Sequence, residues 1–419
     1  WLCRGIRLRP LCLLSRLRFD GAGAPIGARM LTPGAMIAFF VVLLSMVLGA
    51  HVYLGVRMIR GAQLPRWQRL SVMAGLGLSF CLGMITMPLR DTAWAQPFLV
   101  LGYLAIGIFG AFFFMFLFKD ILWGLGTLLD KAVPVMPQDP DRRRLLQNAL
   151  NLGVIGSAAG VGLVGFAKAQ SAAKVEEVTV PIEGLPLELE GFSIVQISDV
   201  HVGPTVRRAR IEEIVGTING LDADLVAVTG DLVDGSVEGL KEHVAPLAGI
   251  KSRHGVFFTT GNHEYYSGAE AWCEHVSSAL GMTVLMDEHV TITHQGHTLV
   301  VGGVADLKAA QHVASHRSDP FAAIEGAPEN AVLRLLLAHQ PPSIYDAALA
   351  GWDLVLSGHT HAGQFFPFTL LIHLAQPFVA GLHKVEKAWL YVNRGTTYWG
   401  PPIRLGAAQE ITRLVLMRA

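Results

Sequence analysis

The sequence predicts an all-α membrane domain of four transmembrane helices followed by an α/β domain. Hydrophobic residues make up 52% of the 419 residues and charged residues only 16%, and the mean hydropathy is +0.43. These values are too apolar for an ordinary soluble protein and predict membrane segments. From residue 178 onward, short apolar runs alternate with amphipathic stretches, a pattern typical of a domain that contains both strands and helices.

Charge and cysteine content exclude some classes of protein. The formal net charge is +0, so no nucleic acid partner is expected. The four cysteines have neither the spacing of a zinc site nor that of a disulfide framework. Nothing in the sequence indicates the oligomeric state.

Four apolar runs are long enough to cross a bilayer as helices, which takes about 20 residues. None of them contains an acidic residue that would mark an ion path. We expect residues 1–35 to be a leader, a tail or an untranslated extension, with Met30 or Met36 as the initiator. The predicted spans are residues 36–56, 70–87, 97–118 and 145–166.

Basic residues in the loops predict the topology. The loop after the first span contains four arginines, and the loop after the third contains two lysines and Arg142-Arg143-Arg144, whereas the second loop has only Arg90. The positive-inside rule therefore places the first and third loops in the cytoplasm, and four spans place the following domain on the outer, periplasmic or extracellular, side. An odd number of spans would leave it in the cytoplasm.

The three arginines at 142–144 also resemble a twin-arginine export signal, although Leu145 and Gln147 depart from the usual Phe and Lys. A plain cytoplasmic anchor remains the alternative. If the stretch is an export signal, the fourth span is either cleaved or retained.

Five predicted strands end in residue types that bind metals. Because the carboxyl ends of parallel strands gather at one edge of a sheet, one shared metal site explains all five endings. The residues are Asp199 and His201 after 192–197, Asp231 after 225–228, Asn262 after 256–260, His339 after 332–338, and His359 and His361 after 354–356.

The order of these motifs resembles the calcineurin-like metallophosphoesterase superfamily over roughly the C-terminal half of the chain. The motifs are Asp-x-His, Gly-Asp-x-x-Asp-Gly, Gly-Asn-His-Glu, His and Gly-His-x-His. The closing stretch 393–404 resembles that of the bacterial membrane-associated phosphoesterases. The resemblance implies two packed β-sheets flanked by helices in a metallophosphoesterase domain, 178–419, which a linker, 170–177, joins to the membrane domain, 36–169.

The resemblance also implies a role for each site residue. Two divalent ions, of Mn, Fe or Zn, would share Asp231 as a bridging ligand. His263 would stabilise the transition state or protonate the leaving oxygen, and Asp234 would orient His263, with a surface turn carboxylate as the alternative for Asp234. The first ion would be completed by Asp199, His201 and His361, and the second by Asn262, His339 and His359.

These assignments predict a membrane-anchored, metal-dependent phosphohydrolase that acts by attack of a metal-bound hydroxide, with phosphodiesters favoured over phosphomonoesters. Attachment to the membrane favours a phosphoester carried by lipid or envelope material. A transporter or sensor that uses the C-terminal domain as a binding module is the alternative.

Overall fold

The computed structural model describes residues 33–59, 65–86, 92 and 95–419. The chain divides into two units, Trp1–Ser45 and Met46–Ala419. The leader predicted for residues 1–35 lies outside the described residues except for 33–35, which begin the first helix.

Four long helices precede the first strand. Asp139 caps the fourth, because its carboxylate accepts the backbone N–H groups of Asp141 and Arg142, and Pro140 suits the first helical position. The helices are α1 (Pro33–Ile59), α2 (Arg66–Thr86), α3 (Gln96–Leu129) and α4 (Pro140–Gln170).

Three helices, and not the predicted four, are long and apolar enough to cross a membrane within the described residues. The candidate spans are Val41–Ile59, Phe98–Leu129 and Pro140–Gln170. Helix α2, which holds most of the predicted span 70–87, is not among them. It begins with Arg66, Gln68 and Arg69, which shorten its apolar part, and the side chains of 83–86 and all of residue 87 lie outside the described part of the chain.

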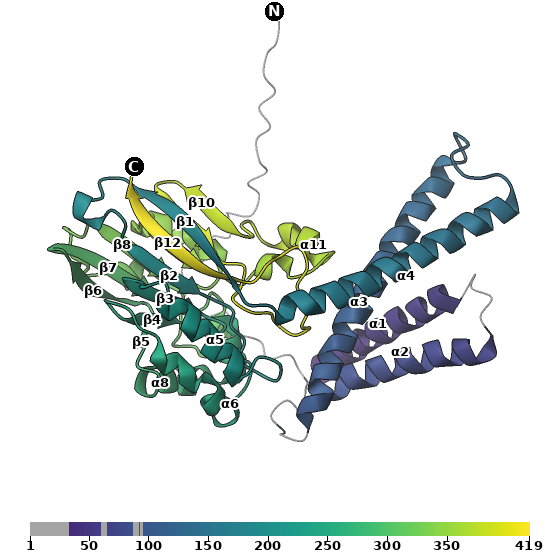
Figure 1. Ribbon diagram of the computed structural model, residues 1–419, viewed down its shortest axis with the longest axis horizontal. Helices are drawn as coiled ribbons and strands as arrows, with labels where there is room; N and C mark the ends of the chain where they lie inside the picture. Colours follow the sequence, from purple (N-terminus) through teal and green to yellow (C-terminus); the bar gives the residue numbers. More distant parts are fainter. Residues whose placement is uncertain (1–32, 60–64, 87–91, 93–94) are drawn as a thin grey trace, which may run out of the picture. The chain divides into compact units, whose positions relative to one another are not determined.

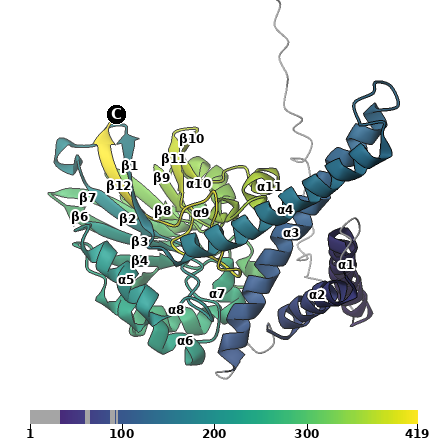
Figure 2. The same cartoon turned by 45° about the vertical axis from the view of Figure 1, so that its right-hand side comes forward.

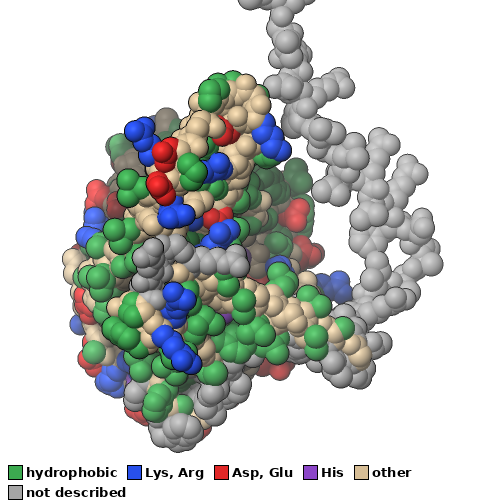
Figure 3. All heavy atoms as spheres, turned by 90° about the vertical axis from the view of Figure 1, so that its right-hand side faces the viewer, with side chains coloured by type: hydrophobic (Ala, Val, Ile, Leu, Met, Phe, Trp, Pro, Cys, Tyr) green, Lys and Arg blue, Asp and Glu red, His purple; other side chains and the backbone are tan. Residues whose placement is uncertain are grey.

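The surface of these helices is apolar. Large side chains such as Leu48, Phe118 and Leu163 are 50%, 60% and 75% exposed. Figure 3 shows hydrophobic side chains gathered on the face that these helices present. Lipid is the medium that such a surface favours.

Two candidate spans extend beyond the predicted ones and so contain an acidic residue, Asp141 near the start of Pro140–Gln170 and Asp120 within Phe98–Leu129. Helix α3 continues past residue 118 to Leu129 and so includes Asp120. Its carboxylate accepts a hydrogen bond from Tyr53 (2.5 Å) and pairs with Arg57 (2.6 Å) and Lys119 (2.9 Å). Through Tyr53 and Arg57, this carboxylate ties α1 to α3.

The rest of the chain forms two six-stranded mixed sheets (Figure 1). The first has the strand order β1 (Lys174–Ile182), β12 (Glu410–Arg418), β2 (Ser193–Ile197), β3 (Leu225–Thr229), β4 (Val256–Thr259), β5 (Thr283–Val284). The second has the order β10 (Gly381–Val385), β11 (Ala388–Val392), β9 (Leu354–Ser357), β8 (Leu333–Leu337), β7 (His297–Gly303), β6 (Glu288–His294). Strand β1 begins inside the predicted linker 170–177.

The sheets pack face to face, and helices cover their outer faces. Alternate residues of β3 show this arrangement: Leu225 and Ala227 belong to the core between the sheets, whereas Val226 and Val228 pack under helices. Strands buried on both faces are apolar throughout, as the sequence shows. The outer helices are α5 (Arg208–Asn219), α6 (Val237–Val244) and α8 (Ala269–Ser278) on the first sheet, and α9 (Pro320–Ile324) and α10 (Ile344–Ala350) on the second.

The two packed sheets flanked by helices confirm the predicted fold class. Helix boundaries differ where local chemistry intervenes. Helix α6 ends at Val244, because Pro246 follows and the chain tightens into a 3₁₀ turn over Ala245–Gly249. Three short helices were not predicted, α7 (Asn262–Ser267), α9 and α11 (Phe368–Ala375).

The five strands with metal-binding residue types run parallel within their sheets. Strand β3 pairs with β2 and β4 in the first sheet, and β8 pairs with β9 in the second. Their carboxyl ends meet where the sheets face each other, and the side-chain amide of Gln196 donates to the carbonyl of Ser357 across that gap (2.9 Å). This edge of both sheets carries the candidate site (Figure 2).

Candidate metal centre

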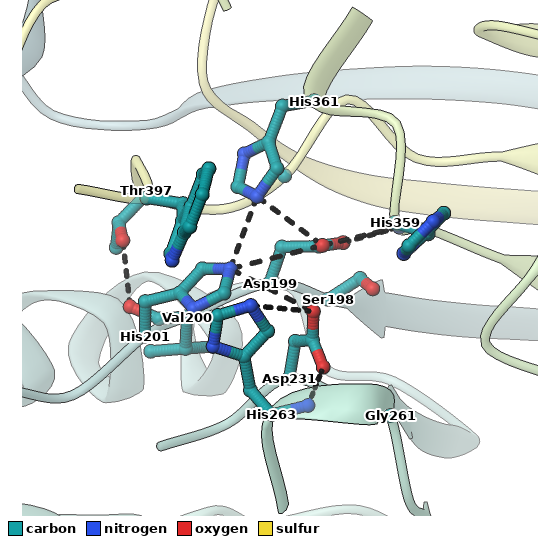
Figure 4. Close-up of polar contacts among 12 residues, drawn as sticks. Ser198, Asp199, Val200, His201, Asp231, Gly261, His263, His359, His361 and Thr397 are labelled. Atoms are coloured by element: carbon teal, nitrogen blue, oxygen red, sulfur yellow. Dashed lines mark hydrogen bonds and ion pairs between the residues drawn. The ribbon is translucent and has the colours of Figure 1, made fainter. Parts of the chain in front are cut away.

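Asp199, His201 and His361 form the first cluster of ligand atoms. The Nε2 atoms of His201 and His361 lie 3.0 Å apart, and Asp199 Oδ1 lies 3.3 Å from His361 Nε2 and 3.9 Å from His201 Nε2 (Figure 4). All three residues are buried. Three lone-pair atoms that converge on one point in a buried site fit a metal ion.

Asp231, His339 and His359 form the second cluster. Asp231 Oδ2 lies 3.1 Å from His339 Nε2, which lies 3.2 Å from His359 Nδ1. The same Oδ2 atom lies 3.9 Å from His201 Nε2 in the first cluster. Asp231 therefore stands between the two clusters, in the place that the sequence analysis gave to a bridging ligand.

Asn262 is the seventh predicted ligand. It begins α7, directly after Gly261, and a Cβ added to Gly261 would lie 2.2 Å from Asp231 Oδ1. The Oδ1 atom of Asn262 is buried, and no hydrogen-bond partner for it exists among the described residues. A buried amide oxygen without a partner costs stability, and a metal ion is the kind of partner that this atom lacks.

Backbone strain is concentrated at the ligands. Asp199, His201, Asp231, His359 and His361 have φ between 49° and 71°, in the left-handed region that non-glycine residues rarely adopt. Five such residues in one site are held there against a cost of about 1 kcal/mol or more each. This pattern fits a site in which function dictates the side-chain directions.

Glu264 holds the turn that presents Asp231. Its fully buried carboxylate accepts backbone N–H groups from two segments of the chain. Oε2 accepts from Asp231 (2.9 Å) and Gly261 (2.7 Å), and Oε1 accepts from Leu232 (2.7 Å) and Val233 (3.3 Å). One carboxylate thus joins the turn after β3 to the loop after β4, and burial raises its pKa to about 7.

Further hydrogen bonds orient the ligands. His339 Nδ1 donates to the Thr229 carbonyl (2.8 Å), which leaves Nε2 facing the site. The backbone N–H of His359 donates to both oxygens of Asp199 (3.1 and 2.9 Å). Nη2 of the fully buried Arg404 lies 2.8 Å from His361 Nδ1, and its Nη1 donates to the His361 carbonyl (3.0 Å).

His263 lies beside the clusters and contacts Asp234. The Nδ1 atom of His263 is 2.5 Å from Asp234 Oδ1, and the other Asp234 oxygen lies 3.2 Å from His201 Nδ1. Burial alone would lower the pKa of His263, but Asp231 and Asp234 outweigh it and raise that pKa to about 9. The ring is therefore protonated near neutral pH, with Nε2–H directed at the site, 4.0 Å from Asp231 Oδ2.

The electrostatics of the ligands follow from the same contacts. Burial opposes the ionisation of Asp231, but His339 and His263 outweigh it and hold the pKa of this carboxyl well below its usual range. Burial lowers the pKa of His359 to about 4, and burial and Arg404 lower the pKa of His361. These two imidazoles are neutral at pH 7, which is the form that binds metals. Burial would lower the pKa of His339, but Asp231 outweighs it and raises that pKa, so His339 has to lose a proton when an ion binds.

The donor set is a mixture of oxygen and imidazole nitrogen atoms. Such a set suits Mn, Fe or Zn, whereas Ca and Mg prefer oxygen ligands alone. The residues present therefore fit a pair of transition-metal ions.

Sequence reasoning missed an aromatic rim beside His263. The rings of Trp399 and Tyr266 lie 5.6 and 5.3 Å from the His263 ring, and both side chains are about half exposed. Trp399 lies in the closing stretch 393–404, and the resemblance of that stretch was the only feature of the sequence that could have indicated Trp399 as a site residue. Arg394 of the same stretch pairs with the buried Glu410.

Comparison with known proteins gives consistent matches. The model of the calcineurin-like phosphoesterase family matches residues 192–363, a segment that contains all seven predicted ligands. A zebrafish "transmembrane protein with metallophosphoesterase domain" is 38% identical over 73% of this chain and 70% of its own. The cattle protein of that name is 37% identical over 77% and 75%. An "uncharacterized metallophosphoesterase" of Helicobacter pylori J99 is 35% identical over 73% and 79%.

Fold and site together define a metal-dependent hydrolase joined to apolar helices. The chain belongs to the calcineurin-like phosphoesterase family. Its relatives named as transmembrane proteins and its three candidate spans indicate membrane association.

Glu264 gives a direct test of how the site is held. Glu264→Ala leaves four buried N–H groups without their acceptor, so we expect the protein to lose about 3 kcal/mol or more of stability and most of its bound metal. Melting temperature and metal content of the purified full-length protein measure both effects. Glu270→Ala, at an exposed position nearby on α8, is the matched control. Equal metal content in the two variants would contradict this role.

Proposed function

We propose that the protein is a membrane-anchored dinuclear phosphoesterase that prefers phosphodiesters. The observation that carries the proposal is the position of Asp231, whose carboxylate is shared between two histidine-rich clusters. Two cations about 3.5–4 Å apart need a bridging anion between them. Manganese is our first choice of metal, with Fe and Zn as the alternatives.

The ions, when bound, supply a water activated at neutral pH and neutralise charge on the phosphoryl group. The protein residues hold the ions and supply a proton. Asp199, Asp231 and the ligand histidines would hold the ions. His263, protonated and held by Asp234, donates the proton from Nε2 to the oxygen of the departing alcohol. Asp234 fixes the direction of that proton by its bond to Nδ1.

We also propose a substrate carried by lipid or envelope material, because the catalytic domain is joined to apolar helices. The transporter or sensor alternative loses support from Asp120, which is fully paired with Arg57, Lys119 and Tyr53. A binding module would not need a protonated His263 directed into the site.

The side of the membrane follows from the number of spans. Helix α2 has 21 residues, which is long enough to cross a bilayer, although it is not among the three candidate spans. If α2 is counted as a fourth span, the loop arginines place the domain outside a bacterial cytoplasmic membrane. With only the three candidate spans, the domain would lie inside. With three spans, the arginines at 142–144 would serve as a cytoplasmic anchor. With four spans, they are compatible with twin-arginine export.

A cysteine-labelling experiment tests this location. We expect Glu238→Cys, at an exposed position of α6, to react with a membrane-impermeant maleimide in intact spheroplasts of an expressing bacterium, in a background without the native cysteines. A cytoplasmic reporter cysteine serves as the control for lysis. Labelling of Glu238→Cys only after lysis would place the domain in the cytoplasm.

Hydrolysis assays test the reaction itself. We expect the Mn-loaded full-length protein to hydrolyse bis-p-nitrophenyl phosphate faster than p-nitrophenyl phosphate, and a chelator to abolish both activities until Mn is restored. Asp231→Asn should abolish activity, because it weakens the shared ligand. His263→Ala should lower kcat by roughly 10²–10⁴ without loss of metal.

His289→Ala is the matched histidine control, since His289 Nδ1 donates to the Ala323 carbonyl and His289 belongs to none of the ligand clusters among the described residues. Its activity should equal that of the parent protein. A parent protein that holds two ions per chain and yet hydrolyses neither ester would count against the enzyme.

A further inference from the structure

An apolar groove of about 1080 Å³ lies between two candidate membrane spans and helix α11 of the phosphoesterase domain. Figures 1 and 2 both show α11 beside α3 and α4. Ring contacts join these elements, since Phe114 of α3 lies 5.0 Å from Phe368 of α11. The lining includes Phe118 and Leu122 of α3, Leu150 and Val154 of α4, and Leu370 and Leu371 of α11.

The lining offers little to a polar ligand. Lys119 is the one charged side chain among the described residues that line the groove. Its ammonium group already donates to Asn151 Oδ1 (2.6 Å) and pairs with Asp120 (2.9 Å). A ligand without charge and with a large apolar surface fits such a lining best.

Helix α11 has no buried residue, although it is rich in leucine. Leu370 is 63% exposed and Leu374 is 86% exposed. The other two walls, α3 and α4, have 34 and 31 residues, so at 1.5 Å per residue both exceed the roughly 30 Å hydrocarbon core of a bilayer. Membrane lipid is therefore the apolar material that is present at this groove.

The groove is tied to the metal centre by two short connections. Phe366 in the groove wall follows the predicted ligand His361 by five positions in the chain, so the two residues lie at most about 18 Å apart. Arg404, which holds His361, donates its backbone N–H to the Gly165 carbonyl of α4 (2.9 Å).

Next to Arg404, Ile403 packs against both membrane helices. A Cβ added at Gly107 of α3 or Gly165 of α4 would lie only 2.6 or 2.5 Å from the Ile403 side chain. The loop that orients a metal ligand thus packs directly against both membrane helices. A ligand that lies along these helices is held within reach of the metal centre.

We propose that the α3–α4–α11 groove binds the hydrocarbon chain of a membrane lipid while the phosphoester group of that lipid is hydrolysed at the metal centre. The inference rests on the proposed phosphoesterase function and gives it a substrate class, phosphoesters that carry a long hydrocarbon chain.

A chain-length series of p-nitrophenyl alkyl phosphates tests the groove, with full-length, Mn-loaded protein in mixed micelles. In each case water attacks phosphorus, the bond to the p-nitrophenyl oxygen breaks, and p-nitrophenolate leaves with the alkyl phosphate as the second product. Only the alkyl chain differs between the ethyl and dodecyl esters. We expect kcat/KM to be at least about 100-fold higher for the dodecyl ester, because each buried methylene adds binding energy.

Two glycine variants of α4 distinguish binding of the alkyl chain in the groove from simple partition of the substrate into micelles. A Cβ at Gly153, which lines the groove, or at Gly156, which does not, would meet no atom within 4 Å. Gly153→Phe fills the groove and should lower the dodecyl-to-ethyl ratio about tenfold or more. Gly156→Phe should leave the ratio unchanged. A parent ratio near one, or an equal fall in both variants, would overturn the proposal.

A photolabelling experiment tests lipid binding in the groove independently of the hydrolytic activity. If the loaded protein hydrolyses neither ester, the proposed function fails, and labelling alone decides the groove. A phosphatidylcholine with a diazirine in its acyl chain, placed in vesicles with the protein, should label groove peptides of α4 or α11 on illumination. Gly153→Phe should lose that label and Gly156→Phe should keep it. An unlabelled groove, or one that cross-links to a second copy of the chain, would refute lipid binding.

Discussion

The structure depends on one carboxylate that two clusters share. Asp231 lies at the end of a central strand, with histidines of the first cluster on one side and of the second on the other. Its negative charge offsets the repulsion that two nearby cations would exert on each other. The left-handed backbone at Asp231 directs the carboxylate to this place, and Glu264 stabilises that backbone through four N–H groups.

The sequence predicted the strands, and the structure brings the predicted ligand residues together, because each of them follows a short apolar run and the carboxyl ends of such runs meet at one sheet edge. The order of motifs then gave roles to Asp199, His339 and the other ligands. What the sequence did not predict depends on contacts between distant segments. Arg404 reaches His361 across 43 positions, and Trp399 comes beside His263 only after the last loop folds back.

The membrane region was predicted less completely. Composition alone located the apolar runs, but α3 ends eleven residues beyond the predicted span, past Lys119 and Asp120, which contact α4 and α1. Helix α11 had no sequence signal. An eight-residue helix is too short for its pattern to stand out, and its role depends on which helices lie beside it.

The most direct test of the account is anomalous X-ray diffraction from crystals of the Mn-loaded protein. Two peaks about 3.5–4 Å apart are expected, one between His201 and His361 and the other between His339 and His359, with Asp231 in contact with both. A single peak, or two peaks of which only one touches Asp231, would contradict the shared-carboxylate account.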